Sequence, residues 1–386
     1  MAVTNATDQV MQATAQKYYS GAIDETVRDR LWMAMLQREG RISNDMDGYD
    51  LNWDVMFSLP DTTGYVEFQS HGFAQHSAYK QLQIDVRGNK VTDTLDYKQR
   101  LTNSGPQIVD LWGTKMMNLK ASMAVSLGRF AFTDGSASGN ENNFQGMNTF
   151  LKKVGGTCVA TDRVKIPSGS YGALTMDLAT YGGSGSWSTT LGTTAGVPPN
   201  AALATDWPDG NGKCEYDFLA PKNINSTSTA WTGTATWKAN SDTILRASTG
   251  WICMLTGGNA PTMYLMSGRM LREFKDHMFE KFRVIQGSSD VALGLGFPGS
   301  AATEFEGTVL AQDFDCPADT AYGLNPNAME LMFCKMPEDS DMKRAGDYMT
   351  IGPSRVSGST VYEYILMTFG NMRYRPKHFS AIYPIA

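Results

Sequence analysis

The sequence contains little of what catalytic and metal-binding sites are made from. Only four histidines and five cysteines occur in 386 residues. The sequence also lacks the G-x-S-x-G motif of hydrolase nucleophiles, the H-E-x-x-H motif of zinc proteases and the G-x-x-x-x-G-K-[ST] phosphate-binding loop. These absences exclude the commonest signatures of hydrolytic, zinc-dependent and nucleotide-dependent catalysis. We therefore expect no enzymatic activity, no cofactor and no catalytic residues.

The cysteines do not form the pattern of a disulfide framework. They are odd in number and widely spaced, and no C-x-x-C pair occurs among Cys158, Cys214, Cys253, Cys316 and Cys334. This usage indicates reduced thiols and synthesis in a cytoplasm. The first residues, MAVTNATDQVMQ, lack the basic region and apolar core of a signal peptide. No apolar run approaches the roughly 18–20 residues of a membrane span, so we expect no membrane contact.

Charge of one sign is not concentrated anywhere along the chain. The net charge is −6, and we interpret the lysines and arginines as spread out, with no basic cluster of the kind that reads nucleic acid.

Three short patterns that resemble binding sites are better explained as loops. His71 and His76 have no cysteine or acidic cluster nearby to complete a metal site. The G-x-G-x-x-G match at 294–299 lacks the preceding strand and following helix that a dinucleotide loop needs. Asp313, Asp315 and Asp319 lack the spacing and glycine of a calcium loop, so we interpret them as a solvated acidic loop. We expect no metal site.

Apolar residues at helical spacing predict four helices. The first spans 24–39 and ends at Gly40, and the longest spans about 106–132. In the longest helix the apolar stripe steps by three or four residues through Ile108, Trp112, Met116, Leu119, Met123, Leu127 and Phe130. Two further helices are predicted at 241–255 and 268–279, the latter capped by Ser267.

The segment 52–103 changes to alternation with a period of two. Leu82, Ile84 and Val86 lie on one face of a predicted strand, with polar residues between them. An isolated two-stranded ribbon is barely stable in water and its edges invite pairing with other chains. We therefore expect this ribbon to lie on a neighbouring copy. The candidate anchors of that contact are Trp53, Phe57, Phe68, Phe73 and Tyr79.

The remainder predicts short strands and loops. Residues 156–236 are rich in Gly, Ser, Thr, Asn and Pro with isolated aromatics, which indicates a β-rich insertion. In 303–331 two strand runs flank an acidic loop at 313–319, with a break at Gly307 and a turn at Asn325–Pro326, and we interpret the two runs as a strand–loop–strand pair. Strands are also predicted from 360 to the end.

Several local sequences, taken in order, resemble a known family. These are FQGMNTFL, a tryptophan after YGG, APTMYLMSGRMLREF, and LGFPG…TEFEGTVLAQDFDCP…YGLN. Their shared order resembles the major capsid proteins of tailed bacteriophages with the HK97 fold. No single motif is specific, and the resemblance covers nearly the whole chain.

The resemblance implies an α+β protein with the HK97-like capsid fold. Its parts would be an N-terminal arm and short helix (1–51), an extended β-loop (52–104) and a peripheral domain with a long spine helix (105–155). The β-rich insertion (156–236) would follow, then an α/β axial domain (237–335) and C-terminal strands that return to the peripheral domain (336–386).

The implied function is self-assembly into hexamers and pentamers of an icosahedral shell around double-stranded DNA, contacted non-specifically at most. Scaffold, portal and decoration proteins would be further partners, and the mature location would be the virion. A tail-tube or baseplate subunit is the alternative. Exposed aromatics among Gly, Ser and Asn also leave open a carbohydrate-active enzyme or lectin, although sugar hydrolysis needs two acids facing one cleft.

Overall fold

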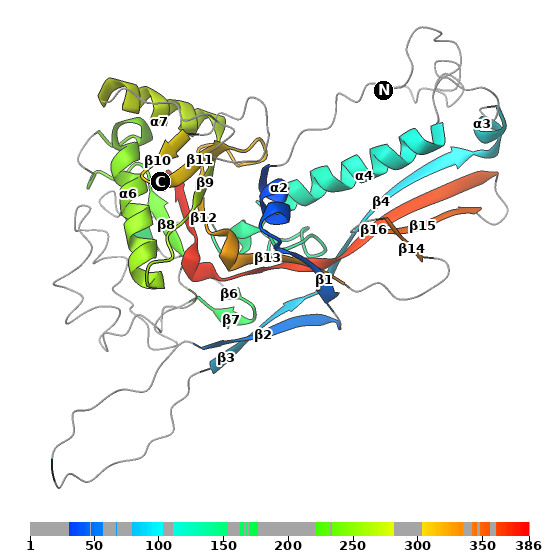
Figure 1. The fold of residues 1–386 in the computed structure, drawn as a ribbon, viewed down its shortest axis with the longest axis horizontal. Helices are drawn as coiled ribbons and strands as arrows, with labels where there is room; N and C mark the ends of the chain where they lie inside the picture. The colour runs from blue at the N-terminus through cyan, green and yellow to red at the C-terminus, as the bar shows by residue number, and fades with distance from the viewer. Residues whose placement is uncertain are drawn as a thin grey trace.

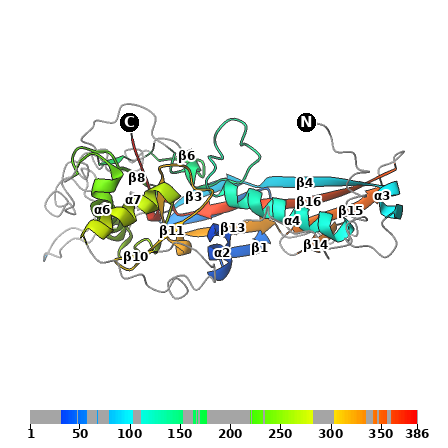
Figure 2. The same ribbon diagram turned by 90° about the horizontal axis from the view of Figure 1, so that it is seen from above.

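The protein is elongated, with a helical lobe at one end and a long twisted sheet at the other (Figures 1 and 2). The computed structural model describes residues 31–46, 48–56, 67, 79–102, 111–152, 163–165, 167, 170–176, 219, 221–231, 234–281, 303–334, 342–345, 348–355 and 360–385. The candidates His71, His76 and the 294–299 loop lie outside these residues.

A six-stranded sheet forms the long part of the molecule, with β16 at its centre. Strand β16 pairs antiparallel with β4 at ten positions, from Val361↔Asp96 to Gly370↔Arg87. The other strands follow the order β1-β13-β16-β15-β14. The strands are β1 (Ile42–Met46), β4 (Arg87–Asp96), β13 (Met329–Cys334), β14 (Met342–Ala345), β15 (Tyr348–Arg355) and β16 (Val361–Tyr374).

Helix α4 (Leu111–Phe130) lies along this sheet (Figure 2). Of its predicted stripe, Leu119, Met123 and Leu127 are buried, and Met116 and Phe130 are partly buried against the same core. The helical prediction is therefore confirmed over the described residues. Two short helices complete this region, α2 (Leu31–Arg38) and α3 (Tyr97–Thr102), and α2 is followed by Gly40 with a left-handed φ of 63°.

A seven-stranded sheet occupies the other end, in the order β10-β11-β9-β12-β17-β8-β5. Its strands are β5 (Val164–Lys165), β8 (Lys222–Asn225), β9 (Met263–Met266), β10 (Thr303–Phe305), β11 (Thr308–Gln312), β12 (Ala321–Leu324) and β17 (Ser380–Tyr383). Helices α6 (Trp237–Thr256) and α7 (Gly268–Lys281) pack on this lobe (Figure 1). Gly257, with φ 68°, is the left-handed C-cap of α6.

Strands β8, β9, β12 and β17 of this second sheet are buried on both faces. In β9, Tyr264 and Met266 belong to the core formed with α6 and α7, whereas Met263 and Leu265 belong to the core that also contains α4. Successive side chains of a strand point to opposite faces, so one strand contributes to both cores. The sheet thus holds the two ends of the molecule together.

The connections differ from the sequence prediction in three places. Strands β11 and β12 do not pair with each other, because β9 lies between them and pairs with both. The 336–386 segment does not return to one region: β16 lies in the six-stranded sheet, but the 3₁₀ turn at Pro376–His378 redirects the chain and β17 joins the other sheet. Strands β5 and β8 of the predicted insertion also belong to that sheet.

Two local predictions need similar correction. Strand β4, assigned to the extended loop 52–104, pairs along its full length with β16 of its own chain. Ser267 was predicted to cap α7, and it does directly precede this helix. Its side-chain hydroxyl forms no hydrogen bond among the described residues. Only its backbone carbonyl accepts a bond from the helix, from the Leu271 N–H at 3.1 Å. Backbone geometry, rather than a side-chain cap, begins this helix.

Two glycine substitutions test the packing of the long sheet. A Cβ at Gly370 would lie 2.1 Å from the Met332 carbonyl oxygen on the paired strand. We expect Gly370→Ala to lower the free energy of unfolding by about 1–3 kcal/mol, because the backbone must move. The control, Gly250→Ala in α6, has no atom within 4 Å of the new Cβ and should raise stability by up to about 1 kcal/mol. Urea denaturation of both variants measures the difference, and equal midpoints would contradict this packing.

Candidate assembly surfaces

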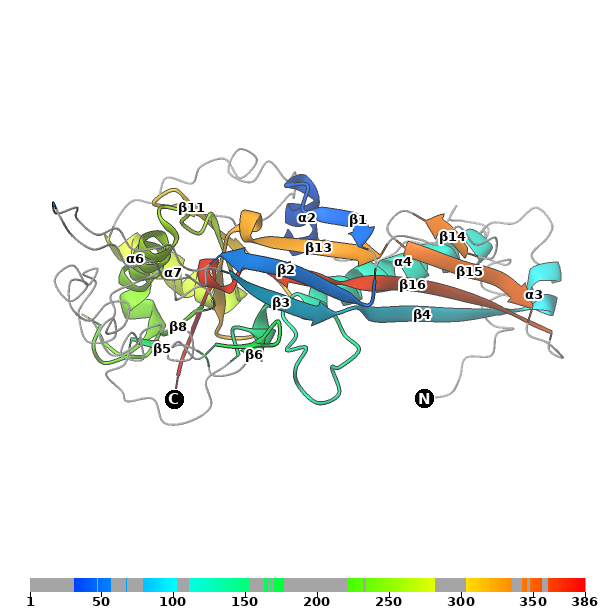
Figure 3. The same ribbon diagram turned by 90° about the horizontal axis from the view of Figure 1, so that it is seen from below.

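The β2–β3 ribbon lies along one side of the long sheet (Figures 1 and 3). Strand β2 (Asp50–Met56) pairs antiparallel with β3 (Tyr79–Asp85). Leu51, Leu82 and Ile84 are buried in the protein's own core, as their spacing predicts, and Gln81, Gln83 and Asp85 face outward. The ribbon is therefore attached to its own subunit by its inner face.

Of the five predicted anchors, the structure describes two. Trp53 lies on the inner face of β2, partly buried, with its ring 6.3 Å from that of Tyr171. Tyr79 lies on the outer face and is 64% exposed, directly opposite Met56, which is 54% exposed. Phe57, Phe68 and Phe73 lie outside the described residues. Trp53 thus contacts its own chain, and the exposed Met56–Tyr79 pair is the apolar contact that the ribbon offers.

A second exposed apolar group lies at the far end of the long sheet. Tyr97 and Leu101 of α3 are 46% and 55% exposed. The Tyr97 ring stacks on Tyr362 of β16 at 6.2 Å, and the Tyr97 N–H donates to the Thr360 carbonyl at 2.8 Å. These contacts fix α3 to the end of the sheet with its apolar side chains facing solvent.

A cavity of about 430 Å³ lies between the ribbon and the turn that follows β16. Its apolar wall includes Trp53, Val55 and Leu82 from the ribbon. The facing wall is the sequence RYRPKH, Arg373 to His378. Three of these six residues, Arg373, Arg375 and Lys377, are cationic, so the cavity combines an apolar wall with positive charge. We call it the basic cavity.

The charges around the basic cavity are mostly positive. Arg373, Arg375 and Lys377 line it, and Asp54 is the acidic residue of its lining. Arg373 is paired with Glu330 at 2.5 Å. Behind the turn, Lys222 of β8 is fully buried and its Nζ donates to the Lys377 carbonyl oxygen at 3.0 Å. Within the otherwise spread-out basic residues, RYRPKH places two arginines and a lysine within six residues.

His378 has a lowered pKa. Burial first, and then the charges of Lys222, Arg375 and Lys377, lower the pKa of His378 to about 4. Its buried Nδ1 has no hydrogen-bond partner among the described residues. The imidazole is therefore neutral at pH 7.

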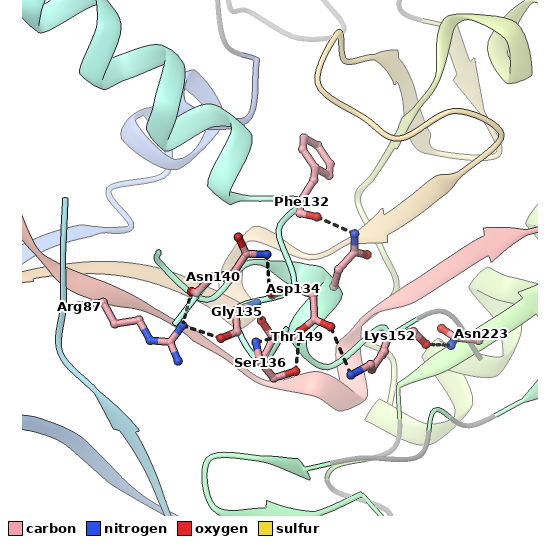
Figure 4. Close-up of polar contacts among 10 residues, drawn as sticks. Arg87, Phe132, Asp134, Gly135, Ser136, Asn140, Thr149, Lys152 and Asn223 are labelled. Atoms are coloured by element: carbon pink, nitrogen blue, oxygen red, sulfur yellow. Dashed lines mark hydrogen bonds and ion pairs between the residues drawn. The ribbon is translucent and has the colours of Figure 1, made fainter. Parts of the chain in front are cut away.

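The connection after α4 joins the two sheets through polar contacts (Figure 4). From β4, the Arg87 guanidinium donates to the carbonyl oxygens of Gly135 and Asn143 at 2.7 and 2.9 Å. Asp134 pairs with Lys152 at 3.4 Å, and the Lys152 carbonyl accepts from the Asn223 side chain of β8 at 2.9 Å. These bonds fix the orientation of the long sheet relative to the helical lobe.

The segment that joins β11 to β12, residues 313–319, is not the solvated loop that the sequence predicts. Asp313 is buried, and its carboxylate accepts the Asp315 N–H at 2.9 Å. Asp315 lies 3.8 Å from Arg129 at the end of α4, and Asp319 lies 3.3 Å from Arg269. Phe314 is nevertheless 66% exposed at the tip. We call this segment the acidic turn.

The described residues show no catalytic arrangement. They contain no group of three or more His, Cys, Asp or Glu side chains placed to bind one metal ion. None of the described helices combines the length and apolar character that a membrane crossing requires. What the described surface offers is apolar and charged area for contact with another molecule.

Structure comparison identifies the architecture. The chain matches the cyanophage A-1(L) capsid asymmetric unit with a TM-score of 0.62 and 12% identity, over 96% of this chain and 97% of that one. It also matches the capsid of an empty GTA particle with a TM-score of 0.50 and 10% identity, over 95% of each chain. This chain has the fold of a phage capsid protein. No protein-family model matches the sequence, and no curated protein matches it either.

Two features of this capsid-protein fold were not predicted from the sequence: the basic cavity and the hydrogen-bonded acidic turn. The RYRPKH segment was a visible signal for the first. Nothing in the sequence places Asp315 beside Arg129, because these residues are far apart along the chain.

The pH dependence of stability tests the electrostatics of the basic cavity in the isolated subunit. The folded-state pKa of His378 is lowered, so the unfolded chain binds this proton first as the pH falls. The contribution of His378 to the free energy of unfolding is therefore fully present above about pH 6.5 and is lost as the pH falls towards 4. We expect His378→Gln to remove this part of the pH dependence while the carboxylate part remains. Identical profiles, measured by urea denaturation between pH 4 and 7, would contradict the lowered pKa of His378.

Proposed function

We propose that this protein is the major capsid protein of a tailed bacteriophage. Copies of it would form the hexamers and pentamers of an icosahedral shell that encloses double-stranded DNA. The observation that carries the proposal is the match to a cyanophage capsid chain at TM-score 0.62 over nearly the full length of both chains. Its role would be structural, without a catalytic step, and its location would be the virion.

The parts of the HK97-like plan can be assigned to the described elements. Helix α4 would be the spine helix of the peripheral domain, lying along the six-stranded sheet. The seven-stranded sheet with α6 and α7 would be the axial domain. The β2–β3 ribbon would be the base of the extended loop, with the exposed Met56–Tyr79 pair at the end of its paired region.

An elongated subunit with different surfaces on its two long sides suits this role. Contacts between unlike surfaces form closed rings when the rotation between neighbours closes. The exposed apolar groups at the ribbon and at α3 lie far apart on the molecule (Figure 1), so each can meet a different neighbour. We expect each copy to bury more than the roughly 1,600 Å² of a standard interface.

The alternatives are less well supported. A tail-tube or baseplate subunit would also self-associate, but the full-length match is to capsid chains. A sugar-binding protein was suggested by aromatics among Gly, Ser and Asn, many of which lie outside the described residues. Scaffold, portal and decoration proteins remain partners proposed from the resemblance.

Electron microscopy of the purified protein tests the proposal. We expect closed, roughly spherical shells, because the subunit completes its burial by contact with other copies. A Met56→Asp/Tyr79→Asp variant should keep its helical circular dichroism and lose assembly, since both side chains are exposed in the single subunit. The two new aspartates would be solvated in the free subunit, so the cost of burying their charge would arise only at the interface between copies.

Two outcomes contradict the proposal. Tubes in place of shells would indicate the tail-tube alternative. A monomer that stays unassembled at high concentration, with or without phage scaffold proteins, would exclude a capsid role.

A further inference from the structure

The two long sides of the subunit carry complementary features. The basic cavity lies at the β2–β3 ribbon, and the acidic turn lies across the long sheet, beside the end of α4 (Figure 1). A ring of identical subunits brings one side of each copy against the opposite side of the next. Features on these two sides therefore face each other if the protein forms rings.

The acidic turn is a pre-organised protrusion. The Asp313 carboxylate accepts from the Asp315 N–H, and the Cys316 N–H lies 3.4 Å from the Asp313 carbonyl oxygen. These local bonds hold the Phe314 side chain outward, 66% exposed. A rigid aromatic side chain loses little conformational freedom on binding, which is why aromatics dominate interface energetics.

The acidic turn also retains charge for a partner. Asp319 pairs with Arg269, whose side chain is 70% exposed, whereas Asp315, paired with Arg129, is only 12% exposed. The surface pair of Asp319 contributes only about 0–1 kcal/mol, so it does not prevent this carboxylate from meeting a second cation. The Asp319 side chain itself is 45% exposed.

The basic cavity has matching size and chemistry. Its 430 Å³ exceeds the volume of one aromatic side chain, and Trp53, Val55 and Leu82 provide an apolar wall for it. Arg375 and Lys377 stand on the opposite wall. A concave cavity of this size admits a side chain more readily than the backbone of a DNA duplex.

We propose that the basic cavity of one copy receives the acidic turn of a second copy, with Phe314 against the apolar wall and the Asp319 carboxylate against Arg375 and Lys377. This contact rests on the proposed self-assembly and specifies one of its interfaces. The contact would also give the basic side chains of RYRPKH a role in binding a second copy, beyond the packing of a single subunit.

Crosslinking in mixed-isotope particles tests the contact directly. Subunits grown in ¹⁴N and ¹⁵N medium are mixed, assembled and treated with a carbodiimide, which joins a lysine to a carboxylate only where they touch. We expect peptides that link Lys377 to Asp319 with one peptide of each isotope. Links of Lys377 confined to its own copy, such as to Asp54, would overturn the proposal.

Charge reversal provides the second readout. We expect Arg375→Glu/Lys377→Glu to reduce the yield of particles at least tenfold, whereas Lys90→Glu/Lys120→Glu makes the same change in net charge at other exposed sites and should assemble normally. Phe314→Ala should also reduce assembly, and circular dichroism checks that each variant folds.

The possible failures are distinguishable. If the wild type forms no shells, the proposed function fails. If wild-type shells form and the reversed cavity assembles as well as its control, only this contact is overturned. Reduced binding of a double-stranded DNA fragment with normal assembly would likewise overturn it and assign the cavity to nucleic acid.

Discussion

The double burial of β9, β12 and β17 is the constraint on which the rest of the structure depends. In each strand the side chains alternate between the core with α6 and α7 and the core with α4, so neither end of the molecule can shift without disturbing the other. Buried polar groups inside this arrangement are satisfied locally: the Tyr264 hydroxyl bonds Ser248 at 2.9 Å, and that of Tyr322 bonds Asn148 at 2.7 Å. The result is one elongated body rather than two independent domains.

That rigid body leaves its long sides for contact with other molecules. The β2–β3 ribbon buries its inner face on its own subunit and presents the Met56–Tyr79 pair outward. The opposite side presents the acidic turn. A subunit whose two sides differ in shape and charge suits the head-to-tail rings that we propose for it.

Helix periodicity and strand alternation predicted much of the architecture. The buried stripe Leu119, Met123 and Leu127 and the alternation at Leu82 and Ile84 are local signals, and the structure confirms both. Pairing between distant segments could not be predicted, because no local signal says that β4 joins β16 or that β17 crosses to the second sheet. The candidate site was predicted least well: Trp53 faces inward, and the basic cavity needs β2, β3 and the end of β16 to come together.

In assembled particles, the exposed sides of the subunit would be buried against other copies. Hydrogen–deuterium exchange of the free subunit and of assembled particles, compared peptide by peptide, tests it most directly. We expect new protection in particles at 50–56 and 79–85, since β2 and β3 pair only with each other in the described subunit, and at 313–319 and 375–378. Little change is expected where β16 and β4 already pair with each other, at 361–370 and 87–96. Unchanged exchange in those four segments, with protection gained elsewhere, would contradict it.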